Sequence, residues 1–463
     1  MVLSGFAAIW KRRDILTLTL ALLLVAAFLF GGASRLNALR LAVVELASLP
    51  LLVIAASRLM KNSSVFQDHK FALGLLGATV ALPLVQLIPL PPGLWTQLPG
   101  RAEMVMALDI VGLEPGWTSL SLTPTETWNA ALALLPPVAA FLGLMASQSQ
   151  RMALRIVYAV LGFGMTSILI GAAQLASGDQ RFYAWTTTGA GFIVGLFANR
   201  NHFATLMLIC LPYATLIAAS QIVRRPDQRH VWIMGVVAAY AVIGLTVGAA
   251  QSRAGILLFL PTLTISILMG WRAAKFGSPR PLALGAGAAV LVSAIVAAAL
   301  LLPQLLDRFE TAQATEARFE RWPIAAQAAG PYLPVGAGVG SFDPIFRTVE
   351  PLKELDATYF NHAHNEYLEI WIESGWMGAA LLILFAYWFG RRSIDAWFHS
   401  KQPDRSLRRA ASIAILVILA HSFVDYPLRT SVLAIVMAVS AAILEGLTTQ
   451  DYSPSRRSRR LAR

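Results

Sequence analysis

Hydrophobic residues occupy most of the chain in long runs that are separated by short polar segments. Each run is close to the roughly 20 helical residues that cross about 30 Å of hydrocarbon, so each predicts a transmembrane helix. About twelve spans are predicted, near 15–31, 38–60, 71–90, 128–146, 153–176, 200–220, 231–250, 254–271, 282–303, 370–390, 410–426 and 431–447. We therefore expect an all-α integral membrane protein that forms one polytopic domain over residues 1–463.

Three polar segments between the predicted spans are too long to be simple connections. They cover residues 91–127, 177–199 and 304–369, and the last lies between the ninth and tenth spans. Long loops on a rigid scaffold commonly carry function, so we expect the active site in the longest segment. The first segment mixes prolines with tryptophans, and we expect it to form a lid or a structural element.

The distribution of Lys and Arg predicts how the spans are oriented. Cytoplasmic loops carry an excess of basic residues, and most of the 37 in this chain fall inside when the N-terminus is cytoplasmic. Both termini are then cytoplasmic and the three long segments are periplasmic. The basic tail, 450–463, is expected to contact anionic lipid. The N-terminal run is also similar to a signal peptide, but with many spans following it we favour an uncleaved first helix.

Composition narrows the class of protein further. Hydrophobic residues make up 57% of the chain, charged residues only 13%, and mean hydropathy is +0.62, which excludes an ordinary soluble domain. The net charge of +12 does not indicate nucleic-acid binding, because the basic residues lie in short loops between spans. The single cysteine, Cys210, excludes an intrachain disulfide and a cysteine-based metal site.

The densest group of ionisable residues lies where the longest polar segment meets the tenth span. Residues 362–378 contain two histidines, His362 and His364, together with three carboxylates and two glycines. Apolar residues recur at helical spacing from His364 onward, which places His364 in the first turn of a helix. An imidazole with an ordinary pKa near 6.5 is largely neutral at pH 7 and can accept a proton as a general base.

Two arginines lie where predicted spans begin. Arg253 separates two apolar runs, and Arg200 lies in a polar group, 199–202, at the start of the sixth span. A charge so close to hydrocarbon is costly, so such an arginine is commonly paired or functional, although it can also snorkel to the interface. Guanidinium groups and helix N-termini both bind phosphate oxygens, so these positions predict a diphosphate site. Helix capping with a satisfied His202 is the alternative for 199–202.

Two further patterns are better explained by structure than by chemistry. His421 and Asp425 are four residues apart and would share one helix face near the outer surface. We favour structural support over a direct catalytic part for this pair. The glycine run at 336–340 invites a nucleotide-binding interpretation, but no P-loop Lys-Ser/Thr follows it, and a tight backbone turn or the close approach of a polar ligand explains it better.

Taken together, these residues resemble the O-antigen ligase and polymerase superfamily, the Wzy C-terminal-domain family, over most of the chain. Its H(N/S/Q)-x9-G-x-x-(G/T/Y) and R-x3-L patterns are met by His364, Asn365, Gly375 and Gly378, and by Arg253 and Leu257. The resemblance implies a GT-C-type inverting glycosyltransferase in the bacterial inner membrane that needs no cofactor, neither nucleotide nor metal. It takes a glycan from undecaprenyl diphosphate on the periplasmic face.

The resemblance also implies roles for single residues. His364 would be the general base, and Arg253, Arg200 and Arg318 would bind the diphosphate. The supporting residues would be Asn365, His362, Gly375, His421 and Asp425. We favour an O-antigen ligase that uses lipid A-core as acceptor. A polymerase that extends a lipid-linked glycan is the alternative, a protein O-oligosaccharyltransferase ranks lower, and a polytopic transporter is the competing class.

Overall fold

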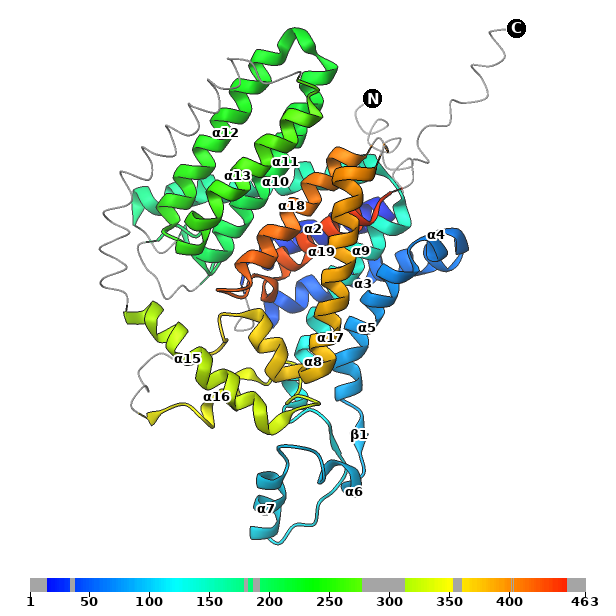
Figure 1. The fold of residues 1–463 in the computed structure, drawn as a ribbon, viewed down its shortest axis with the longest axis vertical. Helices are drawn as coiled ribbons and strands as arrows, with labels where there is room; N and C mark the ends of the chain where they lie inside the picture. Colours follow the sequence, from blue (N-terminus) through cyan, green and yellow to red (C-terminus); the bar gives the residue numbers. More distant parts are fainter. Residues whose placement is uncertain are drawn as a thin grey trace, which may run out of the picture.

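The computed structural model describes residues 15–33, 38–178, 182–185, 192–276, 313–352, 360–400, 402 and 404–447, without the side chains of 313–318. Within these ranges the chain is almost entirely helical (Figure 1). Two short strands, β1 (Pro89–Leu90) and β2 (Thr118–Ser119), form an antiparallel pair. The all-α prediction is confirmed.

Within the described residues, seven stretches of helix are long and apolar enough to cross a membrane. They are α3 (Ala38–Met60), α8 (Pro124–Ala133) with α9 (Leu135–Ser147), α10 (Gln150–Ser177), α11 (Arg200–Arg224), η2 (Pro226–Gln228) with α12 (Arg229–Ala250), α13 (Arg253–Ala273), and α17 (Glu366–Ile394) with η5 (Asp395–His399). Four shorter helices coincide with other predicted spans, namely α2 (Ile15–Phe30), α5 (Lys70–Gln86), α18 (Arg405–His421) and α19 (Ser431–Glu445). The chain is thus a multi-pass membrane protein.

The count of twelve spans stays a prediction. The ninth predicted run, 282–303, and the basic tail, 450–463, lie outside the described residues. The four shorter helices have 15 to 17 residues, so length alone does not establish that each crosses the bilayer.

Helix α11 lies at the centre of the helical core. All twelve side chains from His202 to Tyr213 are buried, and α11 packs against α10, α12, α13 and α18 (Figure 1). Because side chains on every side of this segment are buried, it is surrounded by protein and carries no lipid-facing stripe. Its first residues are therefore held rigidly by four neighbours.

Side-chain caps determine where three of these helices begin. Asn199, Ser252 and Asn365 accept backbone N–H bonds at the starts of α11, α13 and α17. Such caps are commonly worth about 1 kcal/mol each. The expectation that His364 lies in the first turn of a helix is wrong, because Asn365 caps α17 and the helix begins at Glu366. His364 precedes the cap with a left-handed φ of 48°.

The polar segments 91–127 and 304–369 meet at one end of the molecule. Helices α6 (Pro92–Trp95) and α7 (Ala102–Ile110) lie there, as do α15 (Gln313–Ala329), η3 (Gly330–Tyr332) and α16 (Phe342–Arg347) (Figure 1). The segments are tied by hydrogen bonds from Leu122 N to Ala337 O and from Thr127 Oγ1 to Val339 O. The remaining short helix, α4 (Ser63–Asp68), connects α3 to α5.

Gly375 interrupts α17 and lets the glycine run pack against it. Its φ of 52° and ψ of −137° kink the helix, and a Cβ there would lie 2.2 Å from Pro334 O. Trp376 N donates to Pro334 O, and Gly338 N donates to Glu373 O. The glycine run thus lies directly against the backbone of α17, an approach that the sequence did not predict and that depends on a glycine at 375.

Candidate active site

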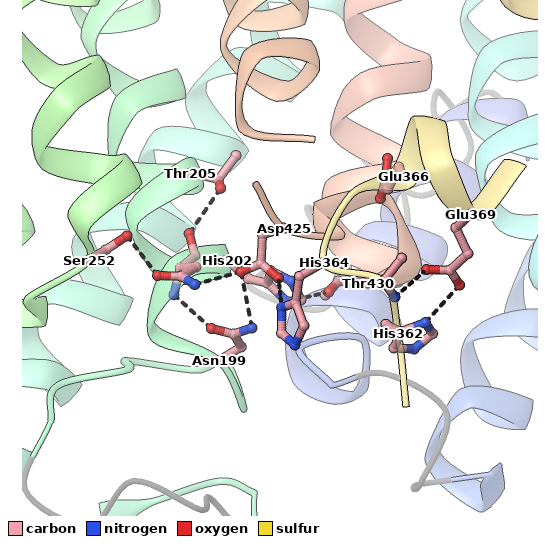
Figure 2. Close-up of polar contacts among 12 residues, drawn as sticks. Asn199, His202, Thr205, Ser252, His362, His364, Glu366, Glu369, Asp425 and Thr430 are labelled. Atoms are coloured by element: carbon pink, nitrogen blue, oxygen red, sulfur yellow. Dashed lines mark hydrogen bonds and ion pairs between the residues drawn. The ribbon is translucent and has the colours of Figure 1, made fainter. Parts of the chain in front are cut away.

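The closest contact of His364 with an ionisable side chain is with Asp425. Nδ1 of His364 lies 3.0 Å from Oδ1 of Asp425, and Figure 2 shows the two side chains facing each other. The Asp425 side chain is fully buried, whereas that of His364 is 12% exposed. The pair therefore presents its imidazole, and not its carboxylate, to the surface.

Two asparagines hold the other oxygen of the Asp425 carboxylate. Asn201 donates its side-chain N–H to Oδ2 over 2.6 Å, and Asn199 donates over 3.4 Å. Asn201 also accepts a 2.8 Å hydrogen bond from Ser252. Both asparagines donate hydrogen bonds to Oδ2 of Asp425. An ionised carboxylate can only accept hydrogen bonds, so these contacts favour the ionised form of Asp425.

Arg200 and Arg253 are the first residues of α11 and α13. The Asn201–Ser252 hydrogen bond joins the residues next to them, so the two helix starts lie side by side. Both arginines are partly exposed, and Arg200 Cζ lies 4.1 Å from the centre of the Phe192 ring. Two adjacent helix N-termini with guanidinium groups make a site suited to an anion.

Two other imidazoles lie buried near this network. His202 Nδ1 lies 2.7 Å from Thr430 Oγ1, and His421 Nδ1 lies 2.8 Å from Thr205 Oγ1. The expected capping by Asn199 is present, but His202 is not a fully satisfied core histidine, because its buried Nε2 has no hydrogen-bond partner among the described residues. The expected shared helix face of His421 and Asp425 is wrong, because α18 ends at His421 and the chain turns before Asp425.

The ring of Tyr426 packs among three imidazoles. Its centre lies 4.3 Å from that of His362, 4.9 Å from His364 and 5.2 Å from His202. The Tyr426 side chain is almost fully buried. Packing against an immobile ring restricts the orientations open to His364.

His362 faces a separate buried ion network. Its Nδ1 lies 2.8 Å from Glu369 Oε1, and Figure 2 shows the pair apart from Asp425. Arg429 Nη2 lies 3.2 Å from the Glu369 carboxylate and 3.1 Å from that of Glu373. His362 and His364 are only two residues apart, but they contact different carboxylates and therefore have different surroundings.

Arg429 stays charged in this setting. Burial lowers the pKa of Arg429, but the facing carboxylates of Glu369, Glu373 and Glu366 more than offset burial, so its pKa lies above that of an ordinary arginine. A permanent cation among three buried carboxylates stabilises the turn after α18, which also carries Asp425. Through the backbone of this turn, the network helps to hold Asp425 in place.

The structure joins five of the predicted site residues in one region, His364, Asp425, Asn365, Arg200 and Arg253. His362 and His421 lie beside this region but contact other partners. Gly375 shapes α17 at a distance from the imidazoles. Arg318 lies in α15, and its side chain is outside the described part of the structure.

Sequence reasoning missed the roles of Tyr426, Arg429, Glu369 and Glu373. One signal was available, because Glu366, Glu369 and Glu373 have i, i+3, i+7 spacing and so share one face of an otherwise apolar helix. Buried carboxylates on one face require a cation. Within the described residues, no group of three or more His, Cys, Asp or Glu side chains is placed to hold a metal ion.

Comparison with known proteins identifies one family model that matches part of the chain. Residues 238–383 match the family model described as O-antigen ligase, and the match includes Arg253, His364 and the kink at Gly375. Arg200 and Asp425 lie outside the matched range, so tertiary contacts alone connect them to it. No curated protein matches the chain. Residues 238–383 thus form a Wzy_C domain, which supports the resemblance of the chain to the O-antigen ligase and polymerase family.

Proposed function

We propose that this protein transfers a glycan from undecaprenyl diphosphate to an acceptor hydroxyl on the periplasmic face, with inversion at the anomeric carbon. The observation that carries the proposal is the 3.0 Å contact between His364 and Asp425, beside the arginine-bearing starts of α11 and α13. Resemblance to the O-antigen ligase and polymerase family supports glycan transfer in general.

His364 acts as the general base. A carboxylate only accepts hydrogen bonds, so the Nδ1–H group of His364 donates a hydrogen bond to Asp425. The neutral ring therefore carries its free lone pair on Nε2. Asp425 orients this tautomer and stabilises the imidazolium that forms when Nε2 takes a proton. The buried carboxylate and the partly exposed ring suit this division of roles.

The reaction is a single displacement. The acceptor hydroxyl gives its proton to Nε2 of His364 while its oxygen attacks the anomeric carbon from the face opposite the diphosphate. The bond between that carbon and the phosphate oxygen breaks, and undecaprenyl diphosphate leaves with the electron pair. Arg200, Arg253 and the adjacent helix N-termini stabilise the negative charge of the leaving group. Arg318 is a further diphosphate contact under this proposal.

We favour lipid A-core as the acceptor, which makes the protein an O-antigen ligase of the inner membrane. The matched family model, described as O-antigen ligase, supports ligase- or polymerase-type activity in general. A polymerase that uses the same donor is the second candidate, since the base and the arginines would act identically on a lipid-linked acceptor. Transfer to protein ranks below both, and transport is the candidate from another class.

Deletion of the gene followed by analysis of surface glycan tests the proposal. Loss of all polymer from lipid A-core, restored by the wild-type chain but not by His364→Ala, is expected for the ligase. Single repeat units left on the lipid would instead assign polymerase activity. If glycoproteins alone lose their glycan, the protein is an oligosaccharyltransferase. Unchanged glycan in the deletion strain would contradict every glycosyltransferase assignment.

A further inference from the structure

A basic pocket lies far from the candidate active site, between the starts of α2 and α10 and the end of α3. Its volume is about 240 Å³, and its lining includes Arg58, Arg151, Arg155, Thr17, Ser147 and Ser149. Among the described residues that line it, three carry positive charge and none is acidic. A hollow of this charge favours an anionic group.

The helices that form the pocket also reach the active site, but with their opposite ends. Helix α2 begins near Thr17 and ends beside Gly32, whose carbonyl accepts a bond from Ala198. Helix α10 begins near Arg151 and ends near Gln174, whose side chain binds the backbone before α11. At about 1.5 Å per residue, a helix of 28 residues is roughly 40 Å long. The pocket therefore lies at the other membrane face.

The helix face that carries two of the arginines continues as apolar surface. Arg151, Arg155, Tyr158, Met165 and Leu169 follow helical spacing on one side of α10. The side chains of Tyr158, Met165 and Leu169 are 50%, 55% and 64% exposed, which is expected of a face that contacts lipid chains. A ligand that used both parts of this face would have an anionic head and an apolar tail.

Among the side chains that line the pocket, the arginines are the ones whose charge can recognise an anionic head group. The Ser147 hydroxyl donates to Leu144 O, and the Ser149 hydroxyl accepts the Met152 N–H as the cap of α10. Guanidinium groups bind phosphate oxygens bidentately, and the N-terminus of α10 adds partial positive charge. We infer that this pocket binds the phosphate of an anionic phospholipid headgroup, in the leaflet opposite the active site.

Binding of phosphatidylglycerol by the purified full-length protein in detergent, measured by native mass spectrometry, tests the inference. The double variant Arg151→Gln/Arg155→Gln is expected to weaken binding about tenfold or more. Arg224→Gln/Arg225→Gln removes the same charge from exposed positions at the same membrane face and is expected to leave binding unchanged. Equal weakening by both variants, or wild-type binding by the first, would overturn the inference.

Two control measurements test whether the pocket is specific for an anionic lipid. Phosphatidylcholine, which has a phosphate but no net charge, is expected to bind equally weakly to the wild type and to the double variant. Inorganic phosphate is expected not to displace phosphatidylglycerol, and displacement would show that the pocket takes free phosphate and not lipid. Should the double variant fail to fold, Arg155→Gln alone is expected to reduce phosphatidylglycerol binding, and no reduction would refute the lipid site.

Discussion

Asn201 lies 2.6 Å from Asp425 through its side-chain nitrogen, and this contact joins positions that are 224 residues apart. It ties the start of α11 to the turn that follows α18. The other carboxylate oxygen of Asp425 contacts His364 over 3.0 Å. One buried carboxylate therefore aligns the imidazole with the helix start that carries Arg200.

We expect Asp425→Asn to lower the rate of glycan transfer by roughly 10²-fold or more, because an amide no longer favours Nδ1 protonation or stabilises an imidazolium. The measurement is the transfer rate of purified protein with lipid-linked glycan. Asn199→Ala removes the 3.4 Å contact with Asp425 and the cap of α11, which is worth about 1 kcal/mol of stability, and should have a much smaller effect on the transfer rate. Wild-type turnover by Asp425→Asn would contradict the role of Asp425.

His364→Ala should lower transfer by about 10² to 10⁴-fold, the range that general bases contribute. His362→Ala removes an imidazole from the same segment but should leave turnover closer to wild type, because His362 contacts Glu369 in a separate network. The melting temperature of each variant separates loss of folding from loss of chemistry. If His362→Ala is the inactive variant and His364→Ala is not, the two roles are exchanged.

Arg253→Ala should weaken use of the lipid diphosphate donor more than Arg253→Lys, since lysine keeps the charge but loses the bidentate geometry. The expected change is a higher KM for the donor together with a lower kcat. Arg272→Ala, at the opposite end of the same helix, is the matched control. Normal donor use by Arg253→Ala at wild-type protein levels would exclude the diphosphate role.

Gly375→Ala should destabilise the protein by about 1–3 kcal/mol or more, because its positive φ and the 2.2 Å approach to Pro334 O leave no room for a Cβ. Gly390→Ala, at a position on the same helix with no atom within 4 Å of the added Cβ, should be nearly neutral. Thermal unfolding in detergent compares the two. Similar melting temperatures for both variants would show that the kink is not required.

Cysteine labelling tests the predicted orientation in the membrane. In a Cys210→Ser background, we expect an impermeant thiol reagent to label Leu352→Cys but not Gln228→Cys in intact spheroplasts. Both positions are exposed, Leu352 in the longest polar segment and Gln228 between α11 and α12. The reverse pattern would invert the topology, and Gln228→Cys in opened membranes confirms that the site can react.

Much of the fold follows from sequence pattern alone. The predicted span at 38–60 coincides with α3, and those near 231–250 and 254–271 agree with α12 and α13 to within two residues at each end. Apolar runs of this length have one low-energy arrangement in lipid, because an unsatisfied backbone group there is costly. Local chemistry also set the helix starts, since capping by an asparagine or a serine depends only on neighbouring residues.

The sequence by itself thus predicted the helices, the resemblance to the O-antigen ligase and polymerase family, and His364 and Arg253 as candidate chemical residues. Tertiary structure decided which side chains meet. The partner of His364 is 61 residues away, and Asp425 was expected on a helix face that the end of α18 removes. Arg429 likewise contacts a carboxylate that is distant in the sequence, because Glu373 lies 56 residues before it. Such pairs depend on how helices pack, and packing is a property of the whole chain that no local pattern of residues contains.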